Sequence, residues 1–211
     1  MLYVKNGKLE VRAPLNASKC DIDMIVASKE GWVRKKLAAS NERLAQRGSF
    51  RLTYGDYVTY RGKQYPIAAK PGNRLGFDEM QFYMPPGLSP EQIKAACIQI
   101  YRLLAKRDLT NRALDFAAQM SVAPTAVKIT GAKTLWGSCS GRKSINFSWR
   151  LIMADDSVID YVVVHELAHL INLNHSKEFW KVVGDTLPDY KERQARLKDL
   201  QRRLASEDWE G

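Results

Sequence analysis

The sequence predicts an α+β fold in two parts, a β-rich portion over residues 1–85 and a helix-rich half over residues 86–211. Short runs of β-favouring residues, separated by turn signals that contain glycine, are concentrated in the first part. Apolar residues at helical spacing dominate the second part, where one apolar segment, residues 162–175, holds every histidine of the chain. Because 211 residues suffice for two small domains or for one continuous core, both organisations stay open.

The first part contains turn signals at regular intervals. Asn6-Gly7 separates two short runs and is typical of a hairpin. Residues 21–40 carry apolar residues at helical spacing, interrupted by Gly31, and predict one helix or two short ones. Residues 50–70 again favour strands, punctuated by Gly55-Asp56 and Arg61-Gly62.

A long helix is expected to begin the second part. Ser89 is suited to the N-cap, Pro90 to the first helical position and Glu91 to the first turn. The helical pattern then continues to Met120, and the stretch Asp108–Asn111 is a place where it could divide.

The remaining elements alternate in type. A second major helix should have Asp156 or Ser157 as its N-cap, and the tail from Asp189 to the end predicts an amphipathic helix with one leucine stripe. Between the long helix and the second major helix, three strands are expected over residues 125–130, 133–139 and 144–152.

Composition is ordinary for a globular protein, with 45% apolar and 27% charged residues. No apolar run approaches the roughly 18 residues that span a bilayer, so no membrane partner is expected. The first residues lack a basic segment followed by an apolar one, and we expect no signal peptide. Cys20, Cys97 and Cys139 are an odd number without close spacing, which favours reduced thiols and a cytoplasmic location.

The chain is basic, with a formal net charge of +10. Residues 1–70 hold 14 Lys and Arg against 6 Asp and Glu. Such a charge can attract nucleic acid or nucleotides. However, only Arg34–Lys36 is tightly clustered, so a solvated cationic surface with no such partner stays open as the alternative.

His165 and His169 predict a metal site. Side chains four residues apart on a helix project from nearly the same face, and both imidazoles can therefore reach one ion. Glu166 lies beside the first histidine and completes the motif H-E-x-x-H, in which a carboxylate stands next to a metal-bound water. The alternative is histidines without metal, but burying them and a glutamate in so apolar a helix would cost several kcal/mol.

His175 can join the same ion only if the helix stops. On a continued helix it would lie about 9 Å further along the axis and on another face. Asn172 and Asn174 are placed to end the helix, since Asn tolerates the left-handed conformation. Three protein ligands with one open position are typical of a catalytic zinc, which is preferred over manganese or iron for helical histidine pairs.

The segments "WGSCS", "INFSWRLI" and "IDYVVVHELAHLINLNHSKEFW", within residues 136–180, resemble the YgjP-like metallopeptidase family, which is distantly related to SprT-like and Wss-like zinc proteases. The resemblance implies a zincin-like catalytic half, in which the H-E-x-x-H helix packs on a small sheet. It also implies that zinc is bound by His165, His169 and His175, with Glu166 as the catalytic carboxylate. Metzincins share the histidine spacing, but they carry Gly where this chain has Asn172.

The function implied is a zinc-dependent metallopeptidase that acts on a peptide or protein through a zinc-bound water activated by Glu166. By its position in the family pattern, Tyr190 is a candidate donor to the oxyanion, although a packed tyrosine is the alternative. The histidines should donate their second ring N–H to a backbone carbonyl or to a carboxylate. The candidate carboxylates are Asp155, Asp156, Glu178 and Asp185.

Substrate is expected to pair with an edge strand above the metal helix, and by resemblance this is the strand over residues 133–139. It would provide Trp136, Gly137 and Ser138, with Trp136 either in the cleft wall or in the core. Asn146 in the next strand is a further candidate for a hydrogen bond across the site, or a purely structural residue.

Other functions stay open. A basic zinc hydrolase could cleave the phosphoanhydrides of nucleotides, although no glycine-rich phosphate loop is present. A nucleic-acid-associated protease would need a coherent basic face. Ser138 or Cys139 as a nucleophile needs a free base, and none is left if all three histidines hold metal.

Overall fold

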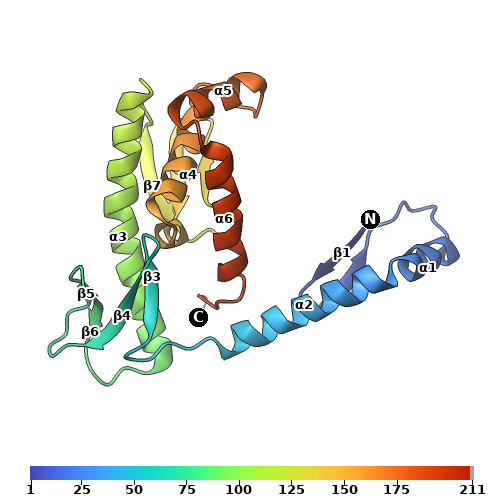
Figure 1. Ribbon diagram of the computed structural model, residues 1–211, viewed down its shortest axis with the longest axis horizontal. Coiled ribbons are helices and arrows are strands. Elements are labelled where there is room, and N and C mark those ends of the chain that lie inside the picture. Colours follow the sequence, from blue (N-terminus) through green and yellow to red (C-terminus); the bar gives the residue numbers. More distant parts are fainter. Residues whose placement is uncertain (210–211) are drawn as a thin grey trace. The chain divides into compact units, whose positions relative to one another are not determined.

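The computed structural model describes residues 1–209; Glu210 and Gly211, with which the predicted second part and its tail helix end, lie outside the described residues. Within that range the chain forms six α-helices and three small sheets, which confirms the α+β class (Figure 1). The residues cluster into two compact units, one of residues 1–50 with the chain end from Arg202, and one of residues 51–201. The division predicted after residue 85 stays a prediction.

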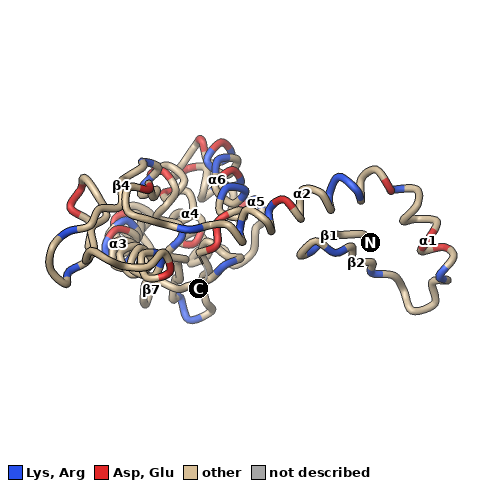
Figure 2. The backbone as a smooth tube through the Cα atoms, turned by 90° about the horizontal axis from the view of Figure 1, so that it is seen from below, with Lys and Arg blue, Asp and Glu red and all other residues tan. Residues whose placement is uncertain are grey.

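The first unit is more helical than expected. Helix α1 (Lys19–Ser28) begins after Ser18, whose hydroxyl accepts from the backbone N–H of Asp21. Helix α2 (Glu30–Ser49) follows a break at Lys29, so the predicted helical region forms two helices, and the second extends well beyond residue 40. Basic residues outnumber acidic ones along α2, where Arg34–Lys36 form one cluster (Figure 2).

The predicted hairpin is present in the same unit. Strands β1 (Leu2–Lys5) and β2 (Lys8–Val11) pair antiparallel, and Asn6 and Gly7 connect them with φ of 49° and 72°. Two consecutive positive φ angles are what a tight hairpin turn requires. The backbone N–H of Gly7 donates to Oγ of Ser40 on α2 at 3.0 Å, which attaches the turn to the helix.

In the second unit, the strands before residue 85 form a four-stranded sheet in the order β3-β4-β6-β5. Strands β4 and β6 are parallel, and the other two pairs are antiparallel. The strands are β3 (Tyr57–Tyr60), β4 (Lys63–Ala69), β5 (Gly76–Phe77) and β6 (Phe82–Met84).

Helix α3 (Pro90–Gln119) begins at the predicted residue, where Ser89 and Gln92 form a reciprocal capping box. The possible division at Asp108–Asn111 does not occur. Asp108 accepts a hydrogen bond from Tyr60 of β3 and another from Arg107, so its carboxylate is satisfied without breaking the helix. Tyr101 of α3 is fully buried and donates to the carbonyl of Thr59 at 2.6 Å, which joins this helix to the sheet.

A three-stranded sheet follows, in the order β7-β9-β8, with β8 at its edge. It consists of β7 (Ala126–Thr130), β8 (Gly137–Cys139) and β9 (Ser144–Ser148). The strand predicted over residues 133–139 is thus limited to three residues. The one predicted over 144–152 ends at Ser148, because Trp149–Met153 form a 3-10 helix. Consecutive apolar residues there are all buried, which a strand with one covered face does not allow.

Helix α4 (Asp156–Ala168) carries the histidine motif and lies between α3 and α6 (Figure 1). Its N-cap is Asp155, one residue earlier than predicted. Helix α6 (Tyr190–Leu204) forms within the predicted tail, but it ends at Leu204, and residues 205–209 are not helical. Helix α5 (Lys177–Thr186) was not predicted. Among the described residues, no helix combines the length and the apolarity that crossing a bilayer requires.

Candidate metal centre

The two histidines of the motif lie one turn apart at the end of α4. The ring centroids of His165 and His169 are 5.1 Å apart. The rest of α4 is almost entirely buried, since its valines and Leu167 are at most 3% exposed. The helix is therefore fixed along its length by the core, and the core sets where the two imidazoles point.

The chain reverses directly after α4, as expected, but not in the predicted way. The helix ends at Ala168, whose carbonyl accepts from the N–H of Asn172 at 2.9 Å. Neither Asn172 nor Asn174 has a positive φ, so the prediction of a left-handed Asn is wrong. The carbonyl of Asn172 instead lies 3.2 Å from Nδ1 of His169, and this contact closes the turn and orients that ring.

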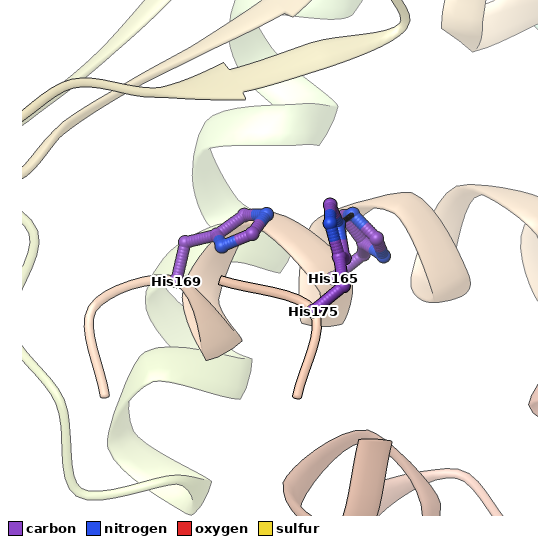
Figure 3. Close-up of side chains that lie close together, drawn as sticks. All are labelled: His165, His169 and His175. Atoms are coloured by element: carbon purple, nitrogen blue, oxygen red, sulfur yellow. Dashed lines mark hydrogen bonds between the residues drawn. The ribbon is translucent and has the colours of Figure 1, made fainter. Parts of the chain in front are cut away.

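This reversal brings His175 back to the helix. Its Nε2 lies 3.1 Å from Nε2 of His165, and ligand nitrogens of all three histidines lie within 4.8 Å of one another. Figure 3 shows His165 on the helix, His169 directly after the helix end and His175 on the segment that follows. The ring of Phe179, fully buried on α5, is 4.6 to 5.0 Å from each imidazole.

One pair of these imidazoles has the spacing of two ligands on a tetrahedral divalent ion. Zinc–nitrogen bonds of 2.0–2.1 Å place two ligand nitrogens about 3.3 Å apart, close to the 3.1 Å between His165 and His175. Burial, followed by the charges of His169 and His175, lowers the pKa of His165 to about 4. Burial lowers the pKa of His169 as well. Both rings are therefore neutral at physiological pH, which is the state that ligates a metal.

None of the carboxylates proposed as partners of the ligands reaches them among the described contacts. Nδ1 of His165 is buried and has no hydrogen-bond partner within the described residues. The carboxylates are engaged elsewhere: Asp155 with Arg196, Asp156 with Arg61 and Arg112, Glu178 with Ser176, and Asp185 with Lys181. Backbone groups serve in their place: His169 bonds the carbonyl of Asn172 and the backbone of Leu173.

Glu166 is 6% exposed, and burial raises the pKa of its carboxyl to about 7. It lies against Gly137 of the edge strand. A Cβ atom at Gly137 would come within 2.5 Å of Cγ of Glu166, closer than real side chains approach. The absence of a side chain at position 137 is thus what allows the carboxylate to lie beside β8.

A cleft of about 450 Å³ opens over these groups, and all three histidines and Glu166 line it. Trp136, Gly137 and Ser138 line it as well. Cys139 also lies in the lining, and burial, then the charge of Glu166, raises the pKa of its thiol. The apolar part of the lining comes from Leu135, Val162, Leu173 and Leu197.

Two predicted site residues lie elsewhere. The ring of Tyr190 stacks on Trp180 at 5.3 Å, and Trp180 stacks on His175 at 5.7 Å, so Tyr190 supports the third ligand from behind and is not part of the cleft lining. Asn146 is likewise outside that lining. It is bonded to Ser138, its Nδ2 donating to Oγ at 3.2 Å.

Tyr161 is a cleft residue that the sequence reasoning missed. It is 3% exposed, lines the cleft, and lies one turn before His165 with the two rings 5.8 Å apart. Burial raises the pKa of its hydroxyl, which also bonds to Gln194. The spacing of four residues from the first ligand was the available signal.

Comparison with known proteins gives one family and three matching chains of solved structures, including two metallopeptidase zymogens. The family described as "YgjP-like, metallopeptidase domain" matches residues 1–200. The metallopeptidase zymogen abylysin of Pyrococcus abyssi is 22% identical, with a TM-score of 0.40 over 42% of this chain and 90% of that one. The zymogen jannalysin of Methanocaldococcus jannaschii is 18% identical, with a TM-score of 0.40 over 46% and 97%. No curated protein matches the chain.

Proposed function

The chain belongs to the family of YgjP-like metallopeptidase domains, and from that premise we propose that it is a zinc-dependent peptidase. The observation that carries the proposal is the convergence of three imidazoles with one buried carboxylate in a single cleft. His165, His169 and His175 would hold the ion. When bound, zinc supplies Lewis acidity, which makes water nucleophilic near neutral pH and polarises a carbonyl.

In this proposal Glu166 moves the proton. Its carboxylate accepts a proton from the attacking water as the new C–O bond forms, and passes that proton to the amine nitrogen as the C–N bond breaks. A carboxyl whose pKa lies near 7 is suited to both transfers, because it gives up and takes up a proton with little free-energy difference at neutral pH. Gly137 keeps this carboxylate against the edge strand.

The substrate would lie along β8. This strand pairs with β9 on one side only, so its other edge can pair with an extended peptide by main-chain hydrogen bonds. The apolar residues of the cleft, Leu135, Leu173 and Leu197, would then contact an apolar substrate side chain. Leu135 and Leu173 are more than half exposed. Exposed apolar side chains that lie together are typical of a surface that a partner covers.

Peptide is favoured over nucleotide as the substrate. No Lys or Arg belongs to the cleft lining among the described residues, whereas sites that bind polyphosphates gather such cations. We further propose a cytoplasmic location, which the free thiols of Cys20, Cys97 and Cys139 support.

The test is one panel of substrates with matched variants. The zinc-loaded protein is incubated with denatured protein, with nucleoside triphosphates and with DNA, beside Glu166→Gln and the exposed control Glu192→Gln. We expect one zinc per chain in all three proteins, and peptide cleavage that falls on the order of 100-fold or more only in Glu166→Gln. Cleavage that survives in Glu166→Gln, or zinc that fails to bind stoichiometrically, would refute the proposal.

A further inference from the structure

The side chains of the edge strand β8 point to two different faces of the small sheet. Successive residues of a strand point to opposite faces. Gly137 pairs with Phe147, and both belong to the face that packs on Glu166 and the core. Ser138 pairs with Asn146, so these two side chains lie on the opposite face.

A second cavity of about 340 Å³ lies on that opposite face. Its polar lining consists of Thr130, Ser138, Asn146 and Ser148. It shares Leu135, Gly137 and Ser138 with the metal cleft, so the two hollows meet at the beginning of β8.

Ala132, which follows β7 and belongs to the lining of this cavity, is held by hydrogen bonds. Oγ of Ser148 donates to the carbonyl of Ala132 at 2.7 Å, and Oγ1 of Thr130 accepts from the N–H of the same residue at 3.4 Å. The amide of Asn146 donates to Ser138 through Nδ2. No contact from the described residues is recorded for Oδ1 of Asn146, which leaves an acceptor at the cavity.

We propose that this second cavity is a substrate subsite that takes a small, uncharged, hydrogen-bonding side chain, such as that of Ser, Thr or Asn. The proposal rests on the proposed peptidase function. A peptide paired with the edge of β8 presents neighbouring side chains to opposite faces of the sheet. A residue that enters the apolar metal cleft is therefore flanked by residues directed toward the polar cavity.

The lining accounts for the chemical class. Among the described residues it contains hydroxyl and amide groups but no Asp, Glu, Lys or Arg, so a charged side chain would be desolvated without a counter-charge. An apolar side chain would cover Oδ1 of Asn146 and leave this acceptor with neither water nor a partner, whereas a hydroxyl or amide could donate to it.

The experiment maps cleavage preferences with a peptide library. Wild type is compared with Asn146→Leu, with the milder Ser138→Ala, and with Lys128→Gln as a control on the same sheet face outside the cavity. One substrate position should select apolar side chains. At a substrate position next to it, wild type and control should prefer Ser, Thr or Asn over Val or Leu by about tenfold. Asn146→Leu should abolish or invert that preference, Ser138→Ala should weaken it, and the apolar preference next to it should persist in both.

The outcomes separate the two proposals. If wild type cleaves peptides but no polar preference exists, or the cavity variants keep it, the subsite is refuted and the peptidase stands. If the zinc-loaded wild type cleaves no peptide in the library, the peptidase function fails and the subsite falls with it. Zinc content and thermal unfolding of each variant identify a variant that has lost its fold. If Asn146→Leu has lost its fold, the side-chain preference of Ser138→Ala, which adds no volume, decides whether the subsite exists.

Discussion

Replacing Gly137 by alanine tests whether the edge strand sets the position of Glu166, the general base of the proposed mechanism. A Cβ atom there would lie 2.5 Å from Cγ, 2.7 Å from Oε1 and 2.8 Å from Cδ of Glu166. Because carbon atoms in contact stand about 3.5–4.0 Å apart, either the carboxylate or β8 must move by about 1 Å. We expect this overpacking to cost about 1–3 kcal/mol in free energy of unfolding. Such a displacement of a catalytic group lowers kcat by about 100-fold.

The assay is a double-mutant cycle. Gly137→Ala is introduced into wild type and into Glu166→Ala, and denaturant unfolding is measured for all four proteins. The alanine should destabilise the wild-type background and be nearly neutral where Glu166 has been truncated. Gly141→Ala is the matched control, since a Cβ atom there meets nothing within 4 Å. Equal costs in both backgrounds, or a kcat within about twofold of wild type, would refute the reasoning that Gly137 makes room for Glu166.

Three further predictions concern the groups around the site. Trp180→Ala removes the ring stacked between His175 and Tyr190, and zinc affinity, measured by competition with a chelator, should fall by about 10- to 100-fold, while Trp180→Phe should retain most of it. Arg112→Ala removes a guanidinium, 19% exposed, that bonds Asp160 at 2.6 Å. Chemical denaturation should show that the free energy of unfolding falls by about 2–3 kcal/mol. For the exposed control Arg34→Ala, it should fall by less than about 0.5 kcal/mol. The hydrogen bond from Arg61 is the main cause that lowers the pKa of Asp156 in the folded protein. The ionised carboxylate therefore stabilises the fold at pH values above its unfolded pKa of about 3.9. This contribution is lost as the pH falls through the lower folded pKa. The stability difference between wild type and Asp156→Asn should accordingly shrink in that acid range, and a constant difference would count against the ion pair.

The convergence of the histidines was predictable because it depends on short-range geometry. A spacing of four residues on a helix fixes His165 and His169, and the chemistry of the third ligand requires the helix to stop before His175. How it stops was not predictable. The structure closes the turn with the backbone of Asn172 and needs no left-handed residue. Helix α5 had a signal that was overlooked, since Ser176 is its N-cap and Phe179 and Val183 are buried one turn apart.

The positions of the predicted site residues outside the motif could not be predicted, because they depend on how strands and helices pair in the folded protein. Whether Asn146 faces the metal is decided by its register opposite Ser138, and a shift of one residue would reverse its direction. Tyr190 begins α6, and the packing of α5 against the third ligand is what places its ring behind Trp180. Such placements follow from how separate elements dock, which spacing along the chain does not encode.

The position of Phe179 means that loading with metal and folding of α5 are thermodynamically linked. Its ring supports every member of the histidine triad from inside the core, so an ion that fixes the triad also fixes the helix that carries the ring. A ligand present at a thousand times its Kd adds about 4 kcal/mol to the state that binds it. Stripping the ion with a chelator should therefore accelerate amide hydrogen exchange in α5 well before it does so in α3.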